Sequence, residues 1–272
     1  MYKRQEGVSL YSLFSTIPNL LGPLIAVGIW HVENMSIFAI VMIFIAVTTT
    51  LFGYRTTFAN TQKEVSPKDE VLPFNAMTVY VQFFKNKALF CSGMIMILSS
   101  IVFGAMSTFI PLYTVREGFA NAGIFLTIQA ITVVIARFYL RKYVPSDGLW
   151  HHRFMMIVLT LLMVASVIVA FGPHIVSIFV YISAIFIGIT QALVYPTLTT
   201  YLSFVLPKIG RNMLLGLFIA CADLGISLGG VLMGPISDTV GFKWMYILCA
   251  LLVTIAMTLS KIRQRQSVSK AS

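Results

Sequence analysis

Three polar side chains that could do chemistry stand inside long apolar runs of this chain. Asp223 is the one acid in the run 212–237, which contains no lysine, arginine or histidine. Gln129 lies within the apolar run 121–143, and Gln191 lies within the run 174–205. A run of about 20 apolar residues is long enough to cross a bilayer as a helix. Polar side chains at such depth usually face the interior of a helix bundle or a water-filled cavity. They predict a polar cavity between helices.

Each of these residues has two interpretations. Asp223 lies roughly 17 Å along its helix at a rise of 1.5 Å per residue, which is near mid-membrane. It is either a proton-coupling carboxylate or substrate contact, or an acid whose hydrogen bonds hold helices together. Gln129 and Gln191 either line the same cavity or join helices, because buried amides need partners.

Tyrosines and one arginine extend this set of candidates. Tyr113, Tyr195 and Tyr201 could offer a ring and a hydroxyl to a substrate, although tyrosines in membrane helices also serve as interfacial anchors. Arg137 could bind an anionic group. Its alternative role is to extend its charged end toward the nearby basic cluster at the membrane surface.

The sequence predicts no catalytic residue, no metal site and no cofactor. His151 and His152 are adjacent in a loop, and no further ligands follow at the spacing that metal sites use. Cys91, Cys221 and Cys249 all lie inside apolar runs, where a cysteine behaves as a small core residue.

The composition is that of an integral membrane protein. The chain has 272 residues, of which 58% are hydrophobic and 10% charged, and its mean hydropathy is +0.90. A soluble domain carries about 25% charged residues. We therefore predict an all-α, polytopic transmembrane helix bundle. Its eight expected spans are 8–30, 34–53, 88–113, 121–143, 154–172, 174–205, 212–237 and 243–262.

The basic residues predict the orientation of the spans. If the N-terminus is cytoplasmic, all 19 lysines and arginines except Arg116 and Lys243 fall on the cytoplasmic side. The net charge of +10 is thus explained by membrane topology, and we expect no nucleic-acid partner. The expected location is the plasma membrane, with both termini in the cytoplasm and the lipid bilayer as the immediate partner.

Glycine spacing predicts close helix packing in two spans. In 212–237, two consecutive G-x-x-x-G spacings come from Gly225, Gly229, Gly230 and Gly234. Small residues four apart allow a neighbouring helix to approach closely. The first span has a kink-forming and tightly packing set, namely Pro18, Gly22, Pro23 and Gly28.

Two stretches carry a resemblance to a known family. The run LGPLIAVG (21–28) resembles the glycine–proline motif on the fifth helix of major facilitator superfamily (MFS) exporters. The stretch 211–246 resembles the eleventh helix and the entry to the twelfth. The resemblance implies that the chain supplies helices five to twelve of a 12-span fold. It further implies a secondary active transporter that rocks two six-helix bundles, exports a small molecule and exchanges it for protons.

The same alignment divides the chain into parts. Residues 6–53 would be the last two helices of the N-terminal bundle, 54–87 the central cytoplasmic loop, 88–262 the C-terminal six-helix bundle and 263–272 a cytoplasmic tail. Residues 1–5 read like a translated sequencing adapter. The remaining N-terminal helices would then be missing partners of this chain.

A narrower resemblance concerns the cargo. The run NAGIFLTIQA (121–130) and the loop PSDGLWH (145–151) are similar to exporters of opine-type metallophores such as staphylopine. A general multidrug exporter is the alternative within the family, and an intramembrane enzyme or a membrane receptor or scaffold is the alternative outside it. The segment 136–153 keeps Arg137, Arg141 and Lys142 but lacks the Asp-Arg pair of the family's loop signature. A gating salt bridge of the family type is therefore in doubt at this loop.

Overall fold

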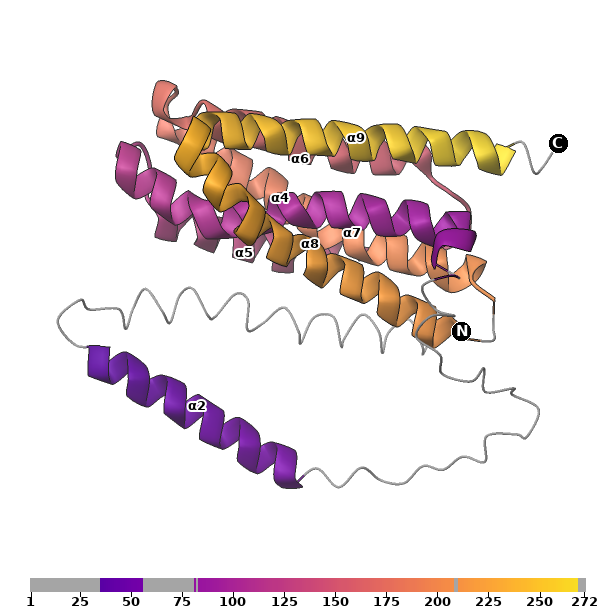
Figure 1. Cartoon of the computed structure of the whole chain (residues 1–272), viewed down its shortest axis with the longest axis horizontal. Helices are drawn as coiled ribbons and strands as arrows, with labels where there is room; N and C mark the ends of the chain where they lie inside the picture. Colours follow the sequence, from indigo (N-terminus) through magenta and orange to yellow (C-terminus); the bar gives the residue numbers. More distant parts are fainter. Residues whose placement is uncertain (1–34, 56–80, 82, 208–209, 269–272) are drawn as a thin grey trace.

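The computed structural model describes residues 35–55, 81, 83–207 and 210–268 (Figure 1). Within these ranges the chain is helical and contains no strand, so the predicted all-α class is confirmed. The helices are α2 (Met35–Arg55), α4 (Lys87–Glu117), α5 (Ala122–Leu140), α6 (His152–Ala170), α7 (Ser177–Val205), α8 (Arg211–Val240) and α9 (Phe242–Val268), with short 3-10 turns η1 (Arg141–Tyr143) and η2 (Gly172–His174).

Six of the described helices, α4 to α9, are long and apolar enough to cross a membrane. Several boundaries differ by a few residues from the predicted spans, and three of these differences follow. Helix α5 ends at Leu140 and η1 follows, whereas α7 begins only after the turn η2, which contains Pro173. Helix α9 continues to Val268, so the start of the predicted tail is helical. The predicted span 8–30, with Gly22, Pro23 and Gly28, lies outside the described residues, as does most of the segment 54–87.

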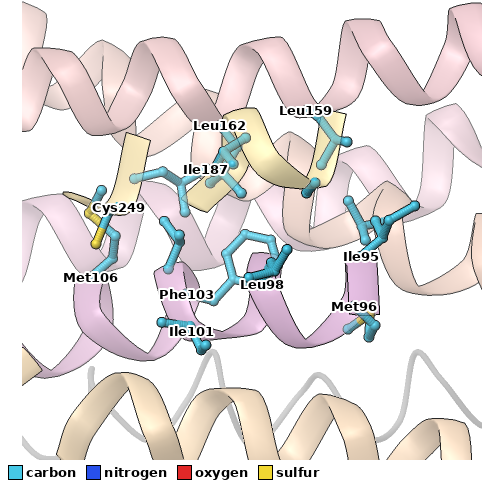
Figure 2. Close-up of a cluster of buried hydrophobic side chains, with 14 of the residues drawn as sticks. Ile95, Met96, Leu98, Ile101, Phe103, Met106, Leu159, Leu162, Ile187 and Cys249 are labelled. Carbon is cyan, nitrogen blue, oxygen red and sulfur yellow. The ribbon is translucent and has the colours of Figure 1, made fainter. Parts of the chain in front are cut away.

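Helix α4 is the centre of the six-helix bundle. In its most apolar stretch 78% of the residues are buried, against 22% for α5. Figure 2 shows the core around it, where Ile95 and Phe103 of α4 lie among Leu162 of α6, Ile187 of α7 and Cys249 of α9. Asn86 begins this helix, because its side-chain oxygen accepts hydrogen bonds from the N–H groups of Ala88 (3.0 Å) and Leu89 (3.3 Å).

The same helix pairs are in contact when the two halves of the bundle are exchanged. Replacing α4, α5 and α6 by α7, α8 and α9 turns the α4–α8 interface into the α5–α7 interface. It also turns the α4–α9 interface into the α6–α7 interface and leaves the α6–α9 pair unchanged. These five pairs are the most extensive helix contacts among the described residues, and α6 and α9 lie side by side in Figure 1. Such symmetry is the mark of an internal inverted repeat in a transporter fold.

Glycines bring α8 against the backbone of α4. A Cβ atom added at Gly225 would lie 2.7 Å from the carbonyl oxygen of Ile97, and one at Gly229 would lie 2.9 Å from the backbone nitrogen of Ala105. From the other side, Gly104 of α4 meets the backbone of Ile226. Gly230 and Gly234 are different, since an added Cβ would have only ordinary contacts at 3.7 Å. One of the two glycine pairs therefore forms the α4–α8 interface.

A polar cluster joins α7, α9 and the loop between α5 and α6 at one end of the bundle. The Trp150 indole N–H donates to the carbonyl oxygen of Ser260 at 3.1 Å, and its ring meets the Tyr201 ring edge-on at 4.9 Å. The Tyr201 hydroxyl accepts hydrogen bonds from Nε and Nη2 of Arg263 at 3.1 and 2.7 Å. We call Trp150, Tyr201, Ser260 and Arg263 the end cluster.

The glycine contacts give the first prediction. Gly229→Ala should destabilise the protein by about 1–3 kcal/mol, the usual cost of overpacking, because its Cβ would press on the α4 backbone. Gly230→Ala is the matched control, and it should be neutral or stabilising because alanine favours helix. The measurement is the fraction of detergent-solubilised protein that stays monodisperse after heating. Equal melting temperatures for the two variants would contradict the predicted role of Gly229.

Candidate functional site

The two glutamines predicted to line a cavity meet at the α5–α7 interface. Nε2 of Gln129 on α5 donates a hydrogen bond to Oε1 of Gln191 on α7 at 3.1 Å. Gly188, one turn before Gln191, makes this approach possible. A Cβ atom there would lie 2.8 Å from both the carbonyl oxygen of Gln129 and the Cβ of Thr132. The two helices therefore touch through backbone where the two carboxamides pair.

The two carboxamides differ in their surroundings. Gln129 is only 7% exposed, and its Oε1 is buried with no hydrogen-bond partner in the described part of the chain. Gln191 is half-buried. Its Nε2 is not fully buried, and no described residue forms a hydrogen bond with it. One carboxamide thus belongs to the interface, and the other is open on one side.

Arg137 and Tyr195 continue the same interface toward the ends of α5 and α7. Arg137 follows Gln129 by about two turns, and Tyr195 follows Gln191 by about one turn. Side chains on a helix lean toward its N-terminus, so the long arginine reaches back toward the level of Tyr195. Both residues are half-buried. The Tyr195 ring also contacts Phe218 of α8 at a centroid distance of 6.0 Å.

Asp223 lies on a face of α8 that no described helix covers. It is exposed, and it forms no hydrogen bond or ion pair with any described residue. It therefore does not hold the described helices together, which was the alternative to a coupling or substrate role. Asp238 is also exposed, in the last turn of α8.

Tyr113, also predicted to line the cavity, lies in an aromatic cluster in the structure. It is 3% exposed and packs against Phe119, Phe242 and Tyr246 at centroid distances of 4.8, 4.9 and 5.6 Å. Its hydroxyl faces the carbonyl oxygen of Ala170 at 3.4 Å. An aromatic core thus encloses Tyr113, away from the glutamines. Tyr201 is likewise occupied, by Arg263 in the end cluster.

The sequence interpretation missed Gly188 and Thr132, which form the close contact beside the glutamine pair. The available signal was the spacing of Gly188 and Gln191, since residues three apart share one face of a helix. The spacing does not indicate that α5 is the helix that packs against this face of α7.

The described residues of this interface offer hydrogen bonds and one positive charge. They include carboxamides, a guanidinium and a phenol, which are groups that bind polar and anionic ligands. Among the described residues no three His, Cys, Asp or Glu side chains gather as metal ligands would. The arrangement is suited to binding a polar molecule between membrane-spanning helices.

Comparison with known proteins identifies the family. The model of the Major Facilitator Superfamily matches residues 2–230 and 122–272. The chain is 71% identical over 261 residues to the staphylopine export protein of Staphylococcus aureus (strain Mu50 / ATCC 700699), a match that covers 96% of this chain and 66% of that protein. It is 23% identical over 176 residues to an uncharacterised MFS-type transporter of Burkholderia mallei (strain SAVP1) and to another of Burkholderia pseudomallei (strain 668), covering 64% of this chain and 42% of each relative.

The chain thus spans slightly less than two thirds of the length of the staphylopine export protein. Its six-helix bundle, built from two halves with exchangeable packing, agrees with the family match. The chain belongs to the major facilitator superfamily.

Proposed function

We propose that this chain is part of a secondary active transporter that exports a small polar molecule, and that this molecule is a metallophore of the staphylopine class. The observation that carries the proposal is the polar face at the α5–α7 interface, where Gln191 is open on one side and Gln129 holds it. The name of the 71% identical relative supports the choice of cargo over a general multidrug range. In this proposal Gln191, Tyr195 and Arg137 line the substrate cavity, and Gln129 supports Gln191 from within the α5–α7 interface.

The proposed transporter has two six-helix bundles. In this proposal residues 88–262 are one bundle, residues 6–53 are two helices of the other, and residues 54–87 are the cytoplasmic loop between them. The face of α8 that carries Asp223 then borders the space between the bundles, which explains why no described helix covers it. The proposal is tested with the complete gene, by measuring staphylopine accumulation in inside-out vesicles energised by a pH gradient. Uptake of a multidrug dye but not of staphylopine would reject the metallophore.

Protons are the proposed coupling ion, and Asp223 is the proposed coupling group. A carboxylate inside a membrane and without a partner in its own bundle can accept a proton from one side and release it on the other. Asp238 has the same chemistry at the end of the helix, so it is a matched control.

Asp223→Asn should lower pH-gradient-driven staphylopine uptake at least tenfold, because asparagine cannot carry the proton. Asp238→Asn should retain most of the activity. The measurement is the initial rate in inside-out vesicles, normalised to the amount of transporter. Equal rates in the two variants would exclude Asp223 as the coupling group.

The proposed location is the plasma membrane, with both termini in the cytoplasm. The loop between α5 and α6 then lies inside the cell, and the segment between α4 and α5, next to Arg116, lies outside. Each side offers an exposed position, namely Ser146 in the loop between α5 and α6 and Val115 in the last turn of α4.

A cysteine at position 115 should react with a membrane-impermeant maleimide added to intact cells, because that position lies outside. A cysteine at position 146 should react only after the cells are opened. The native cysteines Cys91, Cys221 and Cys249 lie in spanning helices, where they are half-buried or buried. Labelling of position 146 in intact cells would reverse the proposed orientation.

A further inference from the structure

The unpaired oxygen of Gln129 determines how the glutamine pair is oriented. In the structure, Gln129 donates through Nε2 to Gln191, and its Oε1 is buried without a partner. Rotating both terminal carboxamides by half a turn would exchange the nitrogen and oxygen of each, and one hydrogen bond between them would remain. It would also bury the NH2 group of Gln129 in place of the carbonyl oxygen. Buried N–H groups without partners are rarer than under-satisfied carbonyl oxygens, and an NH2 group has two such donors. The orientation with Gln129 as the donor is therefore favoured.

This orientation fixes what Gln191 presents to its surroundings. Because Oε1 of Gln191 receives the bond from Gln129, its Nε2 points away from that contact with two N–H donors. The residue is half-buried, and no described residue bonds to its Nε2. Tyr195 follows Gln191 by one turn on α7, and Arg137 follows Gln129 by two turns on α5, so both continue the same interface. The open side of Gln191 is therefore a surface of donors, extended by a positive charge.

We propose that Gln191 and Arg137 form a subsite for a hydrogen-bond acceptor of the cargo, a carboxylate in chemical class, and that Gln129 is a positioning residue which keeps Nε2 of Gln191 turned toward it. This inference rests on the proposed function, since it names the group that the cargo places at the α5–α7 interface. Charge-assisted hydrogen bonds from N–H donors to a carboxylate are about twice as strong as neutral ones. Gln129 contributes through orientation only, because its own carboxamide is buried in the interface.

The test is a double-mutant cycle in the complete transporter. Staphylopine uptake into inside-out vesicles is measured as a function of concentration for wild type, Gln191→Met, Gln129→Met and the double variant. Gln191→Met should raise KM about tenfold or more, because a hydrogen bond to a charged group is lost. Gln129→Met should raise KM by a smaller factor of about three to five, because Gln191 is then free to turn. The double variant should match Gln191→Met, since Gln129 acts only through Gln191.

A further variant tests the polarity of the subsite. Gln191→Glu places oxygen where the N–H donors were, so it should raise KM above the value for Gln191→Met by repelling a carboxylate. A KM below that of Gln191→Met would overturn the assignment to an acceptor. Thr160→Val is the control inside another spanning helix, since among the described residues Thr160 bonds within α6, to the carbonyl oxygen of Met156. It should leave KM unchanged.

The outcomes separate this inference from the proposed function. If wild-type vesicles accumulate staphylopine and the glutamine variants lower only the maximal rate or the amount of protein, the pair is structural and the inference is wrong. Additive increases in KM would likewise exclude the positioning role of Gln129. If wild-type vesicles accumulate no staphylopine, the proposed function fails, and the subsite fails with it.

Discussion

Close contact between helix backbones is the constraint on which this bundle depends. Lipid chains are as apolar as leucine, so spanning helices gain little by hiding apolar side chains from their surroundings. They associate through van der Waals contact, which increases when glycine lets two backbones touch. Gly225 and Gly229 do this on α8, Gly104 does it on α4, and Gly188 does it on α7. These contacts hold α8 against the central helix α4 and place Gln129 next to Gln191.

Much of the fold could be predicted because span length follows directly from bilayer thickness. Apolar runs marked all seven described helices, and the family resemblance gave their order. The faces could not be predicted, because they depend on which helices become neighbours. Gly229 and Gly230 are adjacent and alike in sequence, yet only Gly229 meets the backbone of another helix. The surroundings of Tyr113 could not be predicted for a similar reason, since a tyrosine near a helix end can be an anchor, a ligand or, as in this structure, part of an aromatic core. The end cluster joins residues far apart in sequence, among them Tyr201 and Arg263, and spacing alone does not predict such a contact.

The glutamine pair shows how a polar group is accommodated between apolar helices. A carboxamide needs several partners, and the α5–α7 interface supplies Gln129 with one that is itself only half-buried. Part of the hydrogen-bonding capacity is thus satisfied within the protein, and part stays available on the open side. The two charged side chains considered, Arg137 and Asp223, also differ in whether described helices surround them. Arg137 lies near Tyr195 at this interface, whereas Asp223 has no partner among the described residues.

The two halves of the bundle use glycine in the same way at related interfaces. Gly104 of α4 meets the backbone of Ile226 on α8, and in the related interface Gly188 of α7 meets the backbone of Gln129 on α5. The residue that the glycine meets is aliphatic in one interface and an amide in the other. In a fold with related halves, one such contact can therefore serve packing alone, while the other brings a hydrogen-bonding side chain to the same kind of helix crossing.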